Sequence, residues 1–256
     1  MSIVRARAII ISLSLFATVL VPSAHGQRVE NPTNEIQRLS RAAQVASQQG
    51  RHEDAIRSYN QIIALSAGDP KSAARAHFNV GNTYMQMKKF DLAVAAFQRA
   101  VALDSTAAEA YNNLGESLGE LRQFPRAVEA FTRAAALDPG LSKARYNMGV
   151  TYDRLGQQKY AEFIYRKLIR DKPEYPLAYD GLAVSLSKSG RASEAIAFHE
   201  KAISLNSRDG SYYYNLAISY LILGNHAKAQ EQQQKLRQID PQIAGRLASV
   251  LSKRRS

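Results

Sequence analysis

The sequence predicts an all-helical protein built as a tandem array of helix–turn–helix units. Two observations lead to this prediction. Alanine is the commonest of the 256 residues and β-branched residues are sparse after residue 27, a composition that favours helices over strands. In addition, one pattern of alanine and aromatic residues recurs along the chain at a nearly constant interval, which is the mark of a repeat architecture.

The first 26 residues differ from the rest and are expected to be a secretory signal peptide. Two arginines precede an apolar run from Ala8 to Val21, and small residues follow it up to Gly26. At ~1.5 Å per residue this run is too short for the ~30 Å hydrocarbon core, so we expect no transmembrane span in the mature chain. We expect cleavage between Gly26 and Gln27, with an uncleaved anchor as the alternative, and a flexible lead over residues 27–35.

The absence of cysteine bears on the compartment of the protein, and its net charge bears on the class of partner. The chain has no Cys, so no disulfide framework supports the fold. It also has no Asn-x-Ser/Thr acceptor for glycosylation, and both absences favour export to a bacterial periplasm, with secretion as the alternative. The formal net charge of +12 suits acidic proteins or anionic lipid heads as partners. We expect no nucleic acid partner for an exported protein.

The repeat is clearest from an alanine that stands four residues before an aromatic residue or its substitute. This alanine recurs at intervals of 38, 34, 34, 34 and 34 residues, at Ala55, Ala93, Ala127, Ala161, Ala195 and Ala229. We therefore expect six units, over residues 36–69, 74–107, 108–141, 142–175, 176–209 and 210–240. Residues 241–256 are expected to form a helix that caps the last unit, followed by a basic tail.

Each unit is expected to form two helices that pack closely. In the third unit, Tyr111 and Leu118 lie on one side of a first helix, Arg122 marks the turn, Phe131 lies in the second helix and Pro139 ends the unit. Two helices can approach closely only where no bulky side chain stands at their crossing. The eighth position of successive units is always small: Ala43, Gly81, Gly115, Gly149, Ala183 and Ala217.

This pattern resembles the tetratricopeptide repeat. The third unit shows the motif as Tyr111, Leu114, Gly115, Ala127, Phe131, Ala134 and Pro139. The first unit departs from it, with Ala42 and Ala43 in place of the Leu-Gly pair, and units five and six carry His199 and Gln233 where the aromatic residue belongs. The resemblance implies a superhelix whose inner wall is formed mainly by the first helix of each unit.

A row of asparagines is expected on that inner wall. The sixth position of successive units carries Asn79, Asn113, Asn147 and Asn215, and Gly181 interrupts the row. A primary amide both donates to and accepts from a peptide bond, so such a row can hold an extended backbone of any sequence. The arrangement is similar to the asparagine ladder of O-GlcNAc transferase. The alternative is that Asn before Leu-Gly is common in the family without contacting a ligand.

The other inner positions differ from unit to unit. The candidate partner-binding groove adds polar and apolar residues to the asparagines: Arg75, Asn82, Lys143, Arg154, Lys188, Val184, Tyr214, Ile218 and Ile222. The third unit is acidic there, with Glu109, Glu116 and Glu120, and is expected to be a solvated face. The aliphatic residues of the last two units either form a binding surface or pack against the C-terminal helix.

Catalytic, metal-binding and cofactor-binding constellations are not expected. There is no phosphate-binding glycine loop, and none of the five histidines belongs to an H-E-x-x-H motif. The sequence therefore predicts a non-catalytic scaffold that binds an extended peptide or protein segment in its concave groove. The alternatives are a structural adaptor of a pilus, secretion or cell-wall assembly that uses its outer face, and an accessory subunit of an enzyme. The oligomeric state and the identity of the partner stay open.

Overall fold

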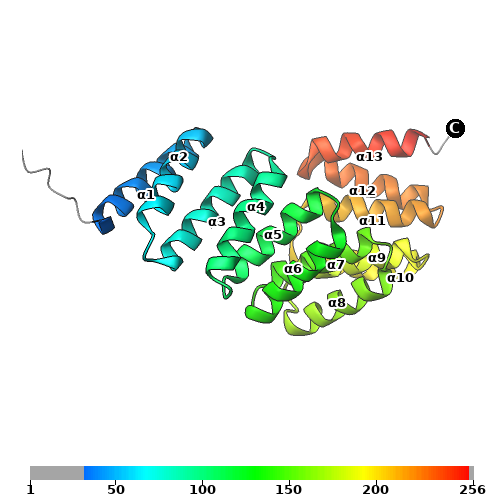
Figure 1. The fold of residues 1–256 in the computed structure, drawn as a ribbon. Helices are drawn as coiled ribbons and strands as arrows, with labels where there is room; N and C mark the ends of the chain where they lie inside the picture. Colours follow the sequence, from blue (N-terminus) through cyan, green and yellow to red (C-terminus); the bar gives the residue numbers. More distant parts are fainter. Residues whose placement is uncertain (1–31, 254–256) are drawn as a thin grey trace, which may run out of the picture.

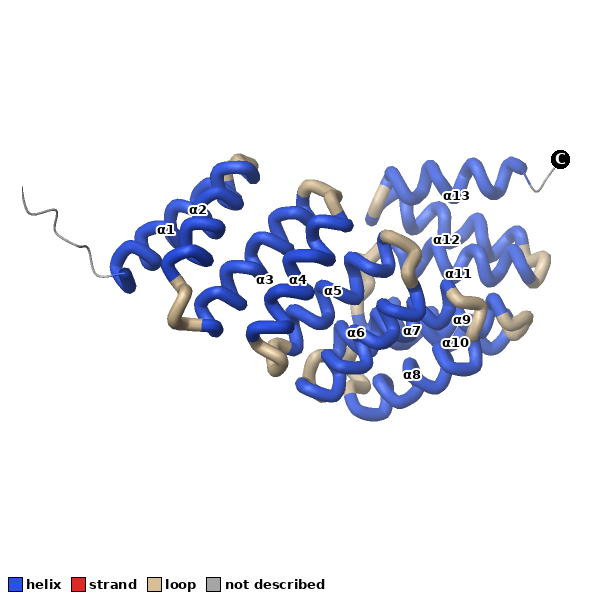
Figure 2. Tube along the Cα trace, in the orientation of Figure 1, coloured by secondary structure: helices blue, strands red, loops and turns tan. Residues whose placement is uncertain are grey.

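The computed structural model describes residues 32–253, and this range folds into helices joined by short turns, with no strand (Figure 2). The helices are α1 (Pro32–Gln48), α2 (His52–Leu65), α3 (Pro70–Gln86), α4 (Phe90–Leu103), α5 (Ala108–Glu120), α6 (Phe124–Leu137), α7 (Ser142–Arg154), α8 (Gln158–Asp171), α9 (Pro176–Lys188), α10 (Ala192–Leu205), α11 (Gly210–Ile222), α12 (His226–Ile239) and α13 (Pro241–Lys253). The all-helical prediction is confirmed. The expected signal peptide and the last three residues of the basic tail lie outside the described residues.

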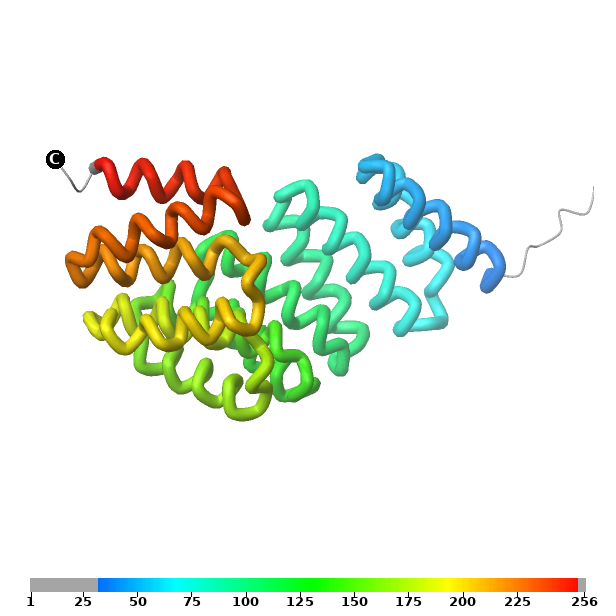
Figure 3. Tube along the Cα trace, turned by 180° about the vertical axis from the view of Figure 1, so that it is seen from behind, coloured from blue at the N-terminus to red at the C-terminus, as the bar shows by residue number. Residues whose placement is uncertain are grey.

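The helices form a single curved row in sequence order, seen from opposite sides in Figures 1 and 3. The twelve helices from α1 to α12 pair into six units, each with an odd-numbered first helix and an even-numbered second helix. The first unit begins earlier than expected, because α1 starts at Pro32 and so takes in residues 32–35 of the expected flexible lead. None of the helices in residues 32–253 is long and apolar enough to cross a membrane.

The helix α13 repeats the first helix of a unit. Its buried residues Ala244, Leu247 and Leu251 lie 34 residues after Gly210, Tyr213 and Ala217 of α11, so the repeat phase continues past the sixth unit. These three side chains belong to one hydrophobic cluster with α11 and α12. The helix therefore covers the end of the array as an unpaired first helix, which removes the exposed apolar face that a last repeat would leave.

Each unit turns between its two helices through one residue with a left-handed backbone. Four of these residues are glycine, and the other two are Lys88 and Arg122, with φ of 56° and 57°. The turn is closed by a hydrogen bond from an amide to a carbonyl oxygen five residues earlier, such as Gln123 N to Leu118 O at 2.9 Å. This Schellman geometry satisfies the end of the first helix and reverses the chain within a few residues.

The small residues stand where helices meet, as predicted. All six marker alanines, from Ala55 to Ala229, have no exposed surface. At the eighth position, a Cβ added to Gly115 would lie 2.7 Å from the ring of Phe131, and one added to Gly149 would lie 2.6 Å from the ring of Tyr165. Real carbon–carbon contacts need roughly 3.5–4.0 Å, so only glycine lets the ring lie against the first helix here.

The first helices line the inner side of the curve. From α3 onward each first helix contacts the first helix of the next unit as well as its own partner, whereas second helices of neighbouring units make no comparable contacts within the described range. Because the first helices of neighbouring units lie closer together than the second helices, the array curves with its first helices on the concave side. Four extra residues separate the first two units, and there the contact between α1 and α3 includes a hydrogen bond from Ser47 Oγ to Gln86 Oε1 at 3.5 Å.

Candidate functional site

The predicted asparagine row lies on first helices along the inner side, but three of its four amides donate to polar side chains of the preceding unit. Asn113 donates from Nδ2 to Asn82 Oδ1 at 2.8 Å, which links α5 to α3. Asn147 donates to Asn112 Oδ1 at 3.2 Å and to Glu116 Oε1 at 2.9 Å, which links α7 to α5. The side-chain amides of Asn113 and Asn147, which were expected to bind a peptide backbone, thus link adjacent units.

The same arrangement recurs at the far end of the row. Asn215 Nδ2 donates to Asp180 Oδ2 at 2.8 Å, which joins α11 to α9. The side-chain oxygens of Asn147 and Asn215 accept no hydrogen bond from the described residues. Asn147 and Asn215 therefore keep acceptors for a partner's backbone N–H groups, although their own side chains donate within the protein. The half-buried Asn79 forms no side-chain hydrogen bond with the described residues, so its amide is available both to donate and to accept.

Gly181 interrupts the row because a side chain there would collide with the preceding unit. A Cβ added at Gly181 would lie 2.6 Å from Cε1 of Tyr165, whose ring also contacts Gly149 of its own unit. Tyr165 is buried, and its hydroxyl lies 3.5 Å from Asp153 Oδ2. The units that carry Phe97 and Phe131 at the equivalent position are followed by Asn113 and Asn147. Tyr59 stands at the same position of the first unit and is followed by Asn79, so the gap follows from the close contact between Gly181 and the Tyr165 ring and not from tyrosine as such.

The charged inner residues divide into a paired set and an exposed set. Glu116 accepts from Lys143 Nζ at 2.7 Å and from Asn112 Nδ2 at 2.8 Å, in addition to its bond from Asn147. No ion pair within the described residues joins the remaining inner charges to another side chain. These exposed residues are Arg75, Glu109, Glu120, Arg154 and Lys188. The acidic third unit is therefore solvated at Glu109 and Glu120, as expected, and neutralised at Glu116.

A pocket of about 370 Å³ opens on this face between α5 and α7. Its walls include Glu116, Glu120, Asn147, Val150 and Arg154, all of which occupy inner positions of their units. Arg75 lines a separate pocket of about 370 Å³ further towards the N-terminal end, where α3 meets α5. The predicted site residues Lys143, Asn147 and Arg154 of unit four are thus brought together around one cavity. Asn113 and Arg75 do not line it.

The apolar inner residues of the last two units are only partly available. Ile218 and Tyr214 pack against the hydrophobic cluster that contains Leu247 of α13, and Arg246 lies over the Tyr214 ring at 5.5 Å. Val184 is half-buried, and Ile222 keeps 46% of its surface exposed. The C-terminal helix therefore covers part of the expected apolar surface.

A row of buried hydroxyl groups was missed by the sequence reasoning. The tenth position of units two to six is always Ser or Thr, and each of these residues is buried: Thr83, Ser117, Thr151, Ser185 and Ser219. Thr151 Oγ1, for example, donates to the backbone oxygen of Asn147 at 2.7 Å. Ser185 follows the interrupting Gly181 and donates instead to Gln158 O at 3.3 Å. The same period that revealed the alanines would have shown this row.

A buried serine, histidine and aspartate also meet between units five and six. His199 Nδ1 lies 2.7 Å from Asp180 Oδ1, and His199 Nε2 lies 3.1 Å from Ser219 Oγ. This is the order of groups in serine hydrolases. However, His199 has no exposed surface, Ser219 has 1%, and neither lines any of the pockets described above. A substrate cannot reach this serine, so the three groups serve to join α9, α10 and α11.

The carboxyl group of Asp153 in α7 has a shifted pKa. Burial raises the pKa of Asp153 above its usual value, and this effect outweighs the lowering by Ser185, Lys188 and the Tyr165 hydroxyl. Its Oδ1 atom is buried without a hydrogen-bond partner among the described residues. Within residues 32–253, no group of three or more His, Cys, Asp or Glu side chains is arranged to hold a metal ion.

Comparisons with protein-family models identify the same repeats along the chain. A family model described as "TPR repeat" matches residues 81–122, and models described as "Tetratricopeptide repeat" match residues 108–141, 142–175 and 200–231. A comparison with curated proteins finds no match.

Solved structures share the fold. MamA is 27% identical with a TM-score of 0.60, over 70% of this chain and 96% of that one. A tetratricopeptide repeat protein from Parabacteroides merdae is 18% identical with a TM-score of 0.75, over 87% of both chains. PilW, a type IV pilus biogenesis factor, is 23% identical with a TM-score of 0.69, over 84% and 98%. The chain belongs to the tetratricopeptide-repeat family.

Proposed function

We propose that this chain is a non-catalytic scaffold that holds an extended segment of a partner protein along its inner face. Tetratricopeptide-repeat proteins bind protein or peptide partners. The observation that carries the proposal is the pocket of about 370 Å³ between α5 and α7, whose walls are inner-face residues of two consecutive units. A pocket on a shared wall suits a side chain of a segment that runs across several units.

The groups around this pocket suit recognition of a backbone and of charged side chains. Asn147 Oδ1 accepts no hydrogen bond from the described residues, so it can accept one from a partner's amide. Glu120 and Arg154 are exposed at the two helix ends beside the pocket, and they can pair with a basic and an acidic partner residue. Val150 supplies the apolar part of the wall.

The N-terminal segment supports a partner outside the cytoplasm. Its two arginines, apolar run and small residues have the form of a secretory signal, so we propose an exported protein, in a bacterial periplasm, with a protein or peptide partner.

Isothermal titration calorimetry with the partner segment tests the proposal. The double variant Val150→Asp and Arg154→Ala changes the pocket wall, and Arg133→Ala, an exposed arginine of the second helix α6, is the matched control. We expect the double variant to weaken binding by at least about ten-fold, which corresponds to roughly 1.4 kcal/mol. The control should bind as the wild type does. Equal affinities for all three proteins would reject the inner face as the binding site.

A further inference from the structure

The outer face of α8 carries two exposed aromatic side chains that the repeat does not require. Tyr160 and Phe163 are 61% and 63% exposed, the highest values for large hydrophobic residues in the described part of the chain. In the other five second helices the position of Phe163 is occupied by Arg57, Ala95, Glu129, Ala197 and Glu231. Repeat packing therefore does not explain the phenylalanine, and exposed apolar surface of this kind marks interaction sites.

A cavity of about 650 Å³ adjoins Phe163. It lies between α6 and α8 over α7, and its apolar lining consists of Ala135, Ala136, Pro139, Met148, Phe163 and Ile164. The cavity adjoins Ala135, where the equivalent residue in the other second helices is larger: Ile63, Val101, Ile169, Ile203 and Arg237. A bulky apolar side chain from another molecule would fit where this chain has only a methyl group.

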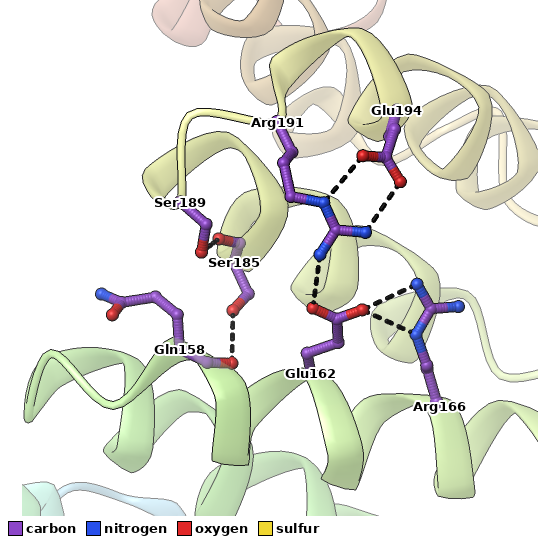
Figure 4. Close-up of polar contacts among 7 residues, drawn as sticks. All are labelled: Gln158, Glu162, Arg166, Ser185, Ser189, Arg191 and Glu194. Carbon is purple, nitrogen blue, oxygen red and sulfur yellow. Dashed lines mark hydrogen bonds and ion pairs between the residues drawn. The ribbon is translucent and has the colours of Figure 1, made fainter.

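The surface around the cavity is positively charged. Residues 158–172 contain five cations and two carboxylates. Figure 4 shows that Glu162 is already bonded to Arg166 and to Arg191 of the neighbouring unit, both at 2.8 Å. The other carboxylate, Asp171, is bonded to Arg145 at 2.5 Å.

The lysines beside the cavity keep their charges available. Lys159, Lys167 and Lys172 form no ion pair within residues 32–253, and Lys167 and Lys172 line the cavity itself. Because the local carboxylates are already paired with arginines, the net positive charge of this face is directed at solvent. Acidic groups of a partner would pair with it.

We propose that this outer surface, formed by Phe163, Lys167, Lys172 and the adjoining cavity, docks an acidic segment of another protein that inserts one bulky apolar side chain beside Phe163. The hollow favours a protein segment over a bilayer, because a flat lipid surface does not fill a recess between two helices. This site is separate from the proposed inner-face site, since α8 is a second helix and the inner wall is formed by first helices.

Selection from a random phage-displayed peptide library on the purified full chain tests this proposal. Two variants use residue types already present at equivalent positions: Phe163→Ala removes the exposed ring, and Ala135→Ile fills the cavity without changing charge. We expect peptides retained by the wild type, but not by the two variants, to be rich in Asp and Glu around one Leu, Phe or Trp. Synthetic copies should bind at least about ten-fold more weakly to each variant and more weakly at high salt.

Three outcomes would overturn the proposal. One is a selection that yields no acidic consensus. Another is equal binding of the selected peptides to the wild type and both variants. The third is binding of the wild type, but not of Phe163→Ala, to vesicles of phosphatidylglycerol and phosphatidylethanolamine without any peptide binding, which would assign the surface to a membrane. The inner-face variant Val150→Asp should leave peptide binding unchanged, which keeps this test independent of the proposed function.

Discussion

Completing the asparagine row should destabilise the protein. In the Gly181→Asn variant, the new Cβ would lie 2.6 Å from Cε1 and 2.7 Å from Cζ of Tyr165, about 1 Å closer than carbon atoms pack. Tyr165 is buried and is held between Gly149 and Gly181, so its ring has little room to move. Overpacking of this kind costs about 1–3 kcal/mol. Asparagine has a higher helix propensity than glycine, but this stabilises the variant by only a few tenths of a kcal/mol.

Urea unfolding followed by far-UV circular dichroism measures this loss. The matched control is Gly119→Asn, because a Cβ added at Gly119 meets no atom within 4 Å. We expect the control to stay within about 0.5 kcal/mol of the wild type, while Gly181→Asn loses about 1–3 kcal/mol. If Gly181→Asn were as stable as the wild type, the steric explanation for the gap in the row would be wrong.

Two further predictions concern the buried polar groups. Because burial raises the pKa of Asp153, its contribution to stability is fully present below its unfolded pKa of ~3.9 and is lost as the pH rises through the folded value. The free energy of unfolding of Asp153→Asn, measured by urea unfolding, should therefore rise relative to that of the wild type between pH 4 and pH 7. If the difference between the two proteins stays constant over this range, the pKa of Asp153 is not raised. His199→Phe restores the aromatic residue of other units but leaves Asp180 without its 2.7 Å partner. This substitution should lower the free energy of unfolding by about 1–3 kcal/mol, and adding Asp180→Asn should recover part of that loss. If His199→Phe were more stable than the wild type, the structural role given to the His199–Asp180 pair would be wrong.

The helical array could be predicted because its determinants are local and periodic. The marker alanines from Ala55 to Ala229 recur in register, and their complete burial follows from the space between two crossing helices. The same phase also places Leu247 and Leu251 of α13 in the core, which is why the last helix could be expected to cover the array.

The finer features depend on distances between side chains of different units, which the period alone does not contain. The row of asparagines was placed correctly on first helices, but the bond from Asn113 to Asn82 requires the separation of α5 and α3. The interruption at Gly181 requires the position of the Tyr165 ring, and the cavity beside Phe163 depends on a small residue at Ala135 in the preceding unit. The hydroxyl row was accessible from the sequence and was overlooked.

The most direct test of the central claim is site-specific photo-crosslinking from the inner face. A benzophenone side chain would replace Asn82, Val150 or Ile222 in turn, and the bound partner residues would be mapped by mass spectrometry. Neighbouring first helices are about 10 Å apart and an extended chain advances ~3.4 Å per residue, so each unit should correspond to roughly three partner residues. We predict crosslinks that advance in order along one partner segment. Crosslinks that follow no order along the partner, or that arise only from a matched outer position such as Glu129, would contradict the claim.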